Sequence, residues 1–180
     1  MIDIAVSARR VFTLPVDLAA ARRQFRDFRH MLQYLPELCL VRTYARDQYR
    51  VRYSATHAGV YRVDLYSDIW ARFDAAEDAL CVSPLQGIPP VASKVTLASL
   101  TGQGAYSSRL ILRSAGARTS ARYAVRIAAA LPTPLGSKLI PNPAVRLFME
   151  RVVRRRVQEI TDAFIQRAIA GLQAQRRDPA

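Results

Sequence analysis

A chain of 180 residues is long enough for one domain with a sizeable hydrophobic core. Hydrophobic residues make up 51% and charged residues 23%, and this composition excludes an intrinsically disordered chain. The net charge is +13 and comes almost entirely from arginine, since the only lysines are Lys94 and Lys138. Such a charge predicts attraction to anionic surfaces that weakens with salt. The preference for arginine is also typical of a GC-rich genome, which roughly halves its weight as evidence for nucleic acid.

The cysteines and the lack of long apolar runs bear on the cellular compartment. Cys39 and Cys81 lie in strand-like runs and are too few for a disulfide framework or a metal set. We expect them to be buried small side chains in a reducing compartment. The N-terminus alternates polar and apolar residues, which is not typical of a signal peptide. No apolar run approaches the roughly 18 residues needed to cross a bilayer, so we expect a cytoplasmic protein.

The N-terminal part predicts a strand followed by a helical segment. Residues 4–14 alternate as a strand, and Asp17 suits a helix N-cap because its carboxylate can accept from the free N–H groups of the first turn. Pro36 ends the helical segment. Apolar residues at spacings of three and four place one face of a helix, or of two short consecutive helices, at Leu18, Ala21, Phe25, Phe28, Leu32 and Leu35.

From residue 38 to 130 the hydrophobic period is two, as in an antiparallel sheet with one buried face. Residues 38–45 and 49–56 predict a hairpin. Further strands are expected at 60–73, 79–83, 95–101, 105–114 and 117–130. The pair Pro89-Pro90 predicts a loop at 84–94, because proline cannot donate to a sheet ladder. Two glycines predict a turn at 101–104.

A proline-rich linker at 131–143 precedes a long helix. Asn142 fits the N-cap and Pro143 the first helical position. The helix is expected to run to about residue 172, within one domain over 1–172 that leaves a frayed tail at 173–180. Its apolar stripe comprises Met149, Val153, Val157, Ile160 and Phe164.

The order of elements is a strand, a helical pair, a run of antiparallel strands and a long helix whose apolar stripe the sheet must cover. This layout resembles the START-like superfamily, also called SRPBCC, over about residues 10–172. The entry segment at 12–17 is similar to that of the superfamily. The proline-rich approach to 144–146 is similar to that of a bacterial and plastid group of uncharacterised proteins within it. The resemblance implies an α+β helix-grip fold, in which a curved antiparallel sheet of about seven strands wraps around the long helix and often encloses a ligand.

Residues that carry enzyme chemistry are sparse. The sequence has no glycine-rich phosphate loop, no nucleophile elbow and no paired histidine and carboxylate segment. His30 and His57 are the only histidines, and we expect both on the surface. A metal site needs three or four ligands at suitable spacing, which these residues do not provide. We therefore expect no catalytic residue, no metal and no cofactor.

The polar face of the strand at 60–73 carries two aspartates and a tryptophan. Asp64 and Asp68 lie ~13 Å apart at ~3.3 Å per residue, too far to share a proton. We expect them to pair with cross-strand arginines such as Arg50 or Arg52. For Trp70 we expect an arginine covering the ring, the alternative being an exposed binding patch.

The inner face of the sheet predicts a binding site. It mixes aliphatic side chains with tyrosines and serines, as small-molecule pockets do, although a solid core with internally bonded hydroxyl groups explains the same pattern. The resemblance favours the cavity. Its expected lining is Val51, Tyr53, Tyr61, Val63, Leu65, Leu110, Tyr123, Val125, Arg156, Val157 and Ile160. We expect Arg156 to lay its stem over the core and its head in water, the alternative being an inward head that pairs with a ligand anion.

Arg151, Arg154 and Arg155 form a basic patch on the long helix. A solvated helix face is the ordinary explanation. The alternative is weak contact with an anionic membrane, at ~1 kcal/mol per arginine. Nucleic acid is disfavoured as a partner because no aromatic stacking platform accompanies a basic groove.

These features favour a non-enzymatic binding or carrier protein for a hydrophobic small molecule, such as a lipid, quinone, pigment or polyketide-like compound. The loop at 84–94 would border its entrance. Two alternatives stay open. A cyclase or hydrolyase would use the same cavity, with tyrosine and arginine as proton donors. A basic docking protein for a membrane, a ribosome or another protein would have a filled core.

Overall fold

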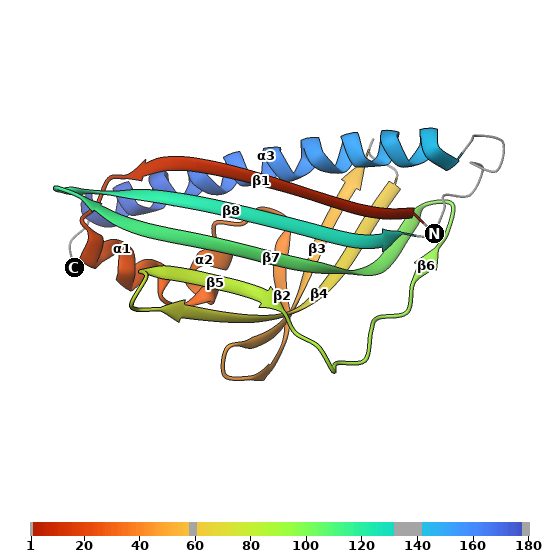
Figure 1. The fold of residues 1–180 in the computed structure, drawn as a ribbon, viewed down its shortest axis with the longest axis horizontal. Helices are drawn as coiled ribbons and strands as arrows, with labels where there is room; N and C mark the ends of the chain where they lie inside the picture. Colours follow the sequence, from red (N-terminus) through yellow and green to blue (C-terminus); the bar gives the residue numbers. More distant parts are fainter. Residues whose placement is uncertain (1, 58–60, 132–141, 178–180) are drawn as a thin grey trace.

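The structure is a computed structural model that describes residues 2–57, 61–131 and 142–177. One curved sheet wraps around the long helix α3 (Asn142–Arg177), and two short helices, α1 (Leu18–Phe25) and α2 (Phe28–Leu32), follow the first strand (Figure 1). The predicted helix-grip architecture is therefore confirmed. The strands are β1 (Ile2–Leu14), β2 (Leu38–Ala45), β3 (Gln48–His57), β4 (Tyr61–Asp74), β5 (Ala79–Pro84), β6 (Lys94–Val95), β7 (Ser99–Ala115) and β8 (Arg118–Leu131).

The strands are ordered β1-β8-β7-β5-β4-β3-β2, with β6 beside β7. All neighbours are antiparallel except for a short parallel pairing of β4 with β7, which begins where β5 has left the sheet. The predicted turn at 101–104 is wrong, because β7 runs straight through it. Here glycine allows close strand approach instead: a Cβ on Gly104 would lie 3.0 Å from the carbonyl oxygen of Ala128. The predicted strand at 95–101 is broken at 96–98, between β6 and β7.

The helical pair after β1 is confirmed, and each member has its own acidic cap. The carboxylate of Asp17 accepts a hydrogen bond from the backbone N–H of Ala20 at 2.8 Å. Asp27 caps α2 in the same way, accepting from the N–H of Arg29 at 2.9 Å. These caps satisfy donors that a helix start otherwise leaves free.

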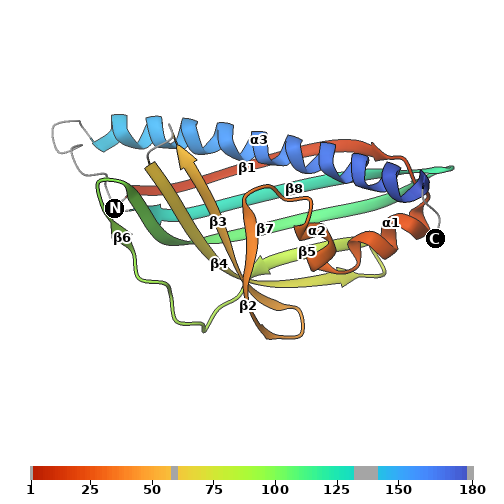
Figure 2. The same ribbon diagram turned by 180° about the vertical axis from the view of Figure 1, so that it is seen from behind.

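The long helix lies across the inner face of the sheet (Figure 2). Its predicted stripe faces the core: Val157 and Phe164 are buried, and Met149, Val153 and Ile160 are partly buried. The predicted end at 172 is wrong, since the helix continues to Arg177 through residues that favour helix. The linker prediction at 131–143 falls mainly on residues 132–141, which lie outside the described residues, as do the side chains of Asn142 and Pro143.

The two ends of the helix–sheet contact differ in packing. At the helical end, where α1 and α2 lie, the core includes Phe25, Met31, Phe164 and Leu172, all almost fully buried. The approach there is so close that a Cβ on Gly171 would lie 2.7 Å from the ring of Tyr34. The other end, which we call the β6 end, holds β6 and the start of α3 (Figure 2).

Candidate functional site

At the β6 end, the inner face of the sheet is apolar but incompletely covered. Several of its side chains are only partly buried, although Ile4 and Val6 beside them are buried, whereas the core at the helical end includes side chains that are almost fully buried. We call the partly buried residues the inner apolar set: Tyr61, Val63 and Leu65 of β4, Ile127 and Ala129 of β8, and Met149 and Val153 of α3. All of them pack against the main core, so the set continues the interior toward solvent.

Small residues in β7 and β8 leave the inner face of the sheet without bulky side chains beside this set. By strand alternation Gly102 and Gly104 face inward, and Gly104 is paired with Ala129. A Cβ on Gly102 would meet Leu65 at 3.7 Å and the Ser93 hydroxyl at 3.9 Å. The end of the loop at 84–94 therefore borders the inner apolar set.

The predicted lining residues fall into two groups. Val51, Leu110, Tyr123, Val125 and Val157 are buried in the continuous core, and the ring of Tyr123 lies 4.9 Å from that of Phe164. The second group is partly buried and comprises Tyr53, Tyr61, Val63, Leu65 and Ile160. Whether these residues bound a cavity stays a prediction. The sequence reading missed four members of the inner apolar set as site residues, although alternation in β8 and the helical stripe indicated that Ile127, Met149 and Val153 face inward.

The buried hydroxyl groups find partners within the protein. The Tyr106 and Tyr123 hydroxyls lie 3.0 Å apart, and Tyr106 donates to Ser108 at 3.1 Å. Ser67 donates to the carbonyl oxygen of Gly104 at 2.9 Å. Burial raises the pKa of Tyr106 and raises that of Tyr123 well above its usual value. These tyrosines therefore remain neutral and act as satisfied core residues.

The side chain of Arg156 is 34% exposed, and its guanidinium is also bonded to protein groups at the surface, which the expectation of a head in water did not include. It donates to the Tyr53 hydroxyl at 3.2 Å and to Glu159 at 3.0 Å, and it also pairs with Glu37. Burial opposes the charge, but hydrogen bonds from Arg156 to Tyr53 and both glutamates raise its pKa. Burial likewise raises the pKa of Tyr53, and the bond from Arg156 only partly offsets this. Carboxylates of the protein thus supply the anion that Arg156 needs.

On the outer face, Asp68 is the centre of a buried polar cluster. Its carboxylate accepts from Arg50 at 2.7 and 2.9 Å, from the Tyr44 hydroxyl at 2.8 Å and from Gln103 at 2.8 Å. The predicted pairing of Asp68 with Arg50 is confirmed, but Asp68 is 4% exposed, so the expectation of a wet face is wrong there. Arg50 also donates to the carbonyl oxygen of Pro89, which ties the loop at 84–94 to the cluster.

Asp64 and Trp70 lie on the same outer side of β4. Asp64 is buried, with Arg62 at 2.8 Å and Arg52 at 4.0 Å, so its predicted arginine pairing is also confirmed. Trp70 is 44% exposed, and no arginine stacks on its ring within the described ranges. The expectation of a covered tryptophan is therefore wrong.

The predicted basic patch is exposed. Arg151, Arg154 and Arg155 project from α3, and Arg155 pairs with Glu159 at 2.9 Å. Leu147 and Val152 are exposed in the same part of the helix, at 66% and 38%. A surface depression of about 470 Å³ is lined by Leu147, Glu150, Arg151 and Arg154. The patch thus combines charge with apolar surface.

A second, shallower depression of about 600 Å³ is open to solvent and contains none of the predicted lining residues. Its floor mixes residues that alternate to the outer face, such as Asp3 and Ala128, with residues that alternate to the inner face, such as Gly104 and Ala129. It is lined by Asp3, Ile4, Ala5, Asp68, Pro84, Gln103, Gly104, Ala105, Ala128, Ala129, Ala130, Arg146 and Glu150. The depression shares Ala129 with the inner apolar set, where the partly buried apolar side chains gather, so we place the candidate site at that set.

The described residues contain no group of three or more histidine, cysteine or acidic side chains placed to hold a metal ion. No helix there is both long and apolar enough to cross a membrane. Cys39 and Cys81 are free thiols and half-buried, so they are less buried than expected.

Comparisons with known proteins bear on the fold. No family model matches the chain, and no curated protein matches it in sequence. Among solved structures, it is similar to a conserved protein from Geobacillus kaustophilus, with a TM-score of 0.59, 11% identity and coverage of 94% of this chain and 97% of that one. It is also similar to the Zhui aromatase/cyclase from Streptomyces sp. R1128, with a TM-score of 0.57, 13% identity and 95% coverage of both chains. It is similar as well to a protein from Thermus thermophilus, TTHA0849, with a TM-score of 0.55, 16% identity and coverage of 93% of this chain and 98% of that one. At these identities the likeness concerns the fold alone.

Proposed function

We propose that this chain, which has the START-like helix-grip fold, binds a hydrophobic small molecule against the inner apolar set, as a carrier or binding protein. The observation that carries the proposal is the difference between the two ends of one sheet face. The helical end is closed by tightly packed aromatic and aliphatic side chains, whereas the β6 end leaves seven apolar residues partly exposed. Covering them with an acyl or ring system is favourable by ~25 cal/mol per Å².

The polar groups beside this set suit binding better than catalysis. Tyr53 and Arg156 both have a raised pKa, so both keep their protons near neutral pH. They can donate hydrogen bonds to a ligand carbonyl or hydroxyl, but neither can accept a proton. The carboxylates nearest to these two groups, Glu37 and Glu159, are ion-paired with Arg156. A cyclase-type reaction that needs a proton acceptor would therefore have to use a carboxylate that is already held by Arg156.

Filling the space over the set should abolish binding. We expect wild type to bind dansyl-undecanoic acid with about micromolar affinity, and Ala129→Phe to bind at least tenfold more weakly because its ring would occupy the floor beside Gly104. Fluorescence titration measures this. Ala128→Phe is the matched control, since the neighbouring side chain points to the outer face and should leave binding unchanged. Equal binding by both variants would place the ligand elsewhere, and no binding by wild type would refute the carrier function.

Native mass spectrometry of freshly purified protein, followed by extraction and identification of any bound compound, tests the ligand class directly. A copurified apolar compound that Ala129→Phe loses and Ala128→Phe retains would support the proposal. Protein free of any such compound and unable to bind the fluorescent acid would favour the filled-core alternative.

We further propose weak docking of the first half of α3 on anionic membranes. Arg151 and Arg154 are exposed without an ion pair within the described residues, and Leu147 and Val152 supply apolar contact. Arg151→Gln/Arg154→Gln should weaken binding to vesicles containing phosphatidylserine roughly thirty-fold, from ~1 kcal/mol per arginine. Vesicle sedimentation at increasing salt measures this, with Arg23→Gln/Arg26→Gln at the helical end as the charge-matched control. Equal binding to neutral vesicles would refute the electrostatic mechanism.

A further inference from the structure

The sheet register gathers arginines on the outer face, on the side opposite the inner apolar set. Arg9 of β1 and Arg109 of β7 are the cross-strand partners of Ala124, and Arg122 and Arg126 lie two residues to either side of it on β8. Neighbours on one strand face are ~6.6 Å apart and cross-strand partners ~5 Å apart. We call these four residues, which surround a small alanine, the arginine cluster.

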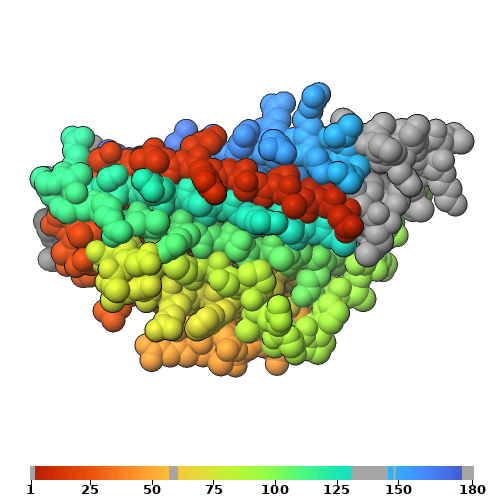
Figure 3. All heavy atoms as spheres, in the orientation of Figure 1, coloured from red at the N-terminus to blue at the C-terminus, as the bar shows by residue number. Residues whose placement is uncertain are grey.

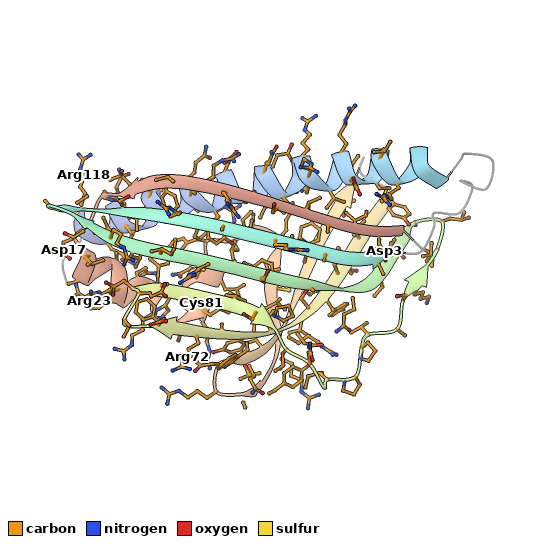
Figure 4. The ribbon with its side chains drawn as sticks, viewed as in Figure 1. Asp3, Asp17, Arg23, Arg72, Cys81 and Arg118 are labelled. Atoms are coloured by element: carbon orange, nitrogen blue, oxygen red, sulfur yellow. The ribbon has the colours of Figure 1, made fainter. Side chains whose placement is uncertain are left out.

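The charge of the arginine cluster is largely uncompensated. Arg109 pairs with Glu77, but Arg9, Arg122 and Arg126 form no side-chain hydrogen bond or ion pair with the described part of the chain. All three are exposed. Asp3 is the only acidic residue in β1, β7 and β8, and Figure 4 shows it at the opposite end of the sheet from Arg118. Like charges at neighbouring strand positions repel each other, so a bound anion would reduce the repulsion between these arginines.

The side chains between the arginines differ along β8. Those beside Arg126 are small and hydroxylated, whereas Val11, which is 70% exposed, and Ile111 lie beside Arg122. Ser7 and Ser107 flank Arg126, and Ala5, Ala128 and Ala105 form the next cross-strand row. No aromatic residue of these three strands points outward by alternation. In the space-filling view the outer surface of β1, β8 and β7 is open along its length (Figure 3). An open surface of this kind allows a backbone to approach the strands.

This chemistry distinguishes between anionic partners. A membrane contact requires apolar insertion, and a protein interface requires apolar or aromatic anchors, for which the surface around the cluster offers little beyond Val11 and Ile111, the two cross-strand partners of Arg122. Arginine with serine hydroxyls is the usual set for phosphate oxygens. We propose that the outer face of β1, β8 and β7 binds the phosphate backbone of a single-stranded nucleic acid. A flexible strand can follow the twist of the arginines, which alternate between β8 and its two neighbours.

The absence of aromatic residues sets the mode of binding. In the sequence, the absence of an aromatic stacking platform argued against nucleic acid, because such platforms are the usual mark of base contact. The sheet register gathers arginines on this face without aromatic residues, so we expect the strand to be held through its phosphates and not through its bases. Binding is therefore independent of base sequence and sensitive to salt.

Fluorescence anisotropy with a labelled single-stranded oligonucleotide of mixed sequence tests the proposal. We expect saturable binding. The logarithm of the association constant should fall with the logarithm of salt concentration at a slope of about −2 to −3, from ~0.7 per phosphate contact. Arg122→Gln/Arg126→Gln should reduce the magnitude of the slope by about 1.4, at an unchanged or raised melting temperature. The charge-matched control, Arg151→Gln/Arg154→Gln on α3, should keep the wild-type slope.

Three results would overturn the proposal. The first is no saturable binding at low salt. The second is equal loss in the two double variants, which would indicate attraction to net charge alone. The third is a vesicle affinity that falls in Arg122→Gln/Arg126→Gln while oligonucleotide affinity does not, which would assign the cluster to lipid headgroups. The proposal is supported if the oligonucleotide binds independently of its base sequence and only Arg122→Gln/Arg126→Gln loses this binding.

Discussion

Val157→Asp should lower the free energy of unfolding by ~3–5 kcal/mol, because it places a carboxylate in the core without a cationic partner. Val157 is 4% exposed in the middle of the α3 stripe, one turn from Thr161, whose hydroxyl is already bonded to the Val157 carbonyl. Urea unfolding measures the loss. The matched control is Val152→Asp, on the exposed side of the same helix, for which we expect a change within ~0.5 kcal/mol. An unchanged midpoint for Val157→Asp would show that α3 does not pack through this face.

Local patterns in the sequence predicted most elements of the fold. The alternation in β4 and β8 identified which side chains face inward, since Ile69, Ala71, Tyr123 and Val125 are all buried. The spacing in α3 identified its buried stripe, and Asp17 marked the start of α1. In each case the information lies within a few neighbouring residues, where a period or a cap has a direct geometric meaning.

Features that depend on distant strands could not be predicted in this way. Gly102 and Gly104 suggested a turn because glycine is common in turns, but their reason is the approach of β4 and β8 to β7. Asp68 alternates to the outer face, yet it is buried because Tyr44, Arg50 and Gln103 converge on it from three other strands. Burial on the outer side of a sheet depends on such partners, which alternation cannot show.

The candidate site was predicted as a face but not as a position along that face. The lining expected from sequence mixed Tyr123 and Val125, which are buried in the core, with Val63 and Leu65, which are partly exposed. The distinction depends on where α1 and α2 close the helix–sheet contact and where α3 begins. Periodicity reports which side of a strand is apolar, but it does not report how far an opposing helix covers it.

Asp68→Asn is the second substitution for which we expect a large loss, ~2–4 kcal/mol at neutral pH. It removes the carboxylate from the guanidinium of Arg50, whose side chain is only 18% exposed. Urea unfolding at pH 7 measures the loss. Asp162→Asn is the control, since its pair with Arg10 at 2.8 Å is solvent-exposed and should contribute less than ~1 kcal/mol. Equal effects of the two substitutions would mean that burial of the Asp68 cluster adds nothing to stability.

The pH dependence of the same variant separates charge from shape. Burial alone would raise the pKa of Asp68, but hydrogen bonds from Arg50 and Tyr44, with the charge of Arg50, outweigh it and lower the pKa below its ordinary value. A lowered pKa in the folded state means that the carboxylate stabilises the fold above the unfolded-state pKa of ~3.9, and that this contribution disappears as pH falls through the folded-state value. The stability difference between wild type and Asp68→Asn should therefore be constant from pH 7 to about pH 5 and shrink in more acidic solution. A difference that stays constant throughout the acid range would show that the variant acts through packing, and that the ion pair with Arg50 is not what holds β3, β4 and β7 together at this point.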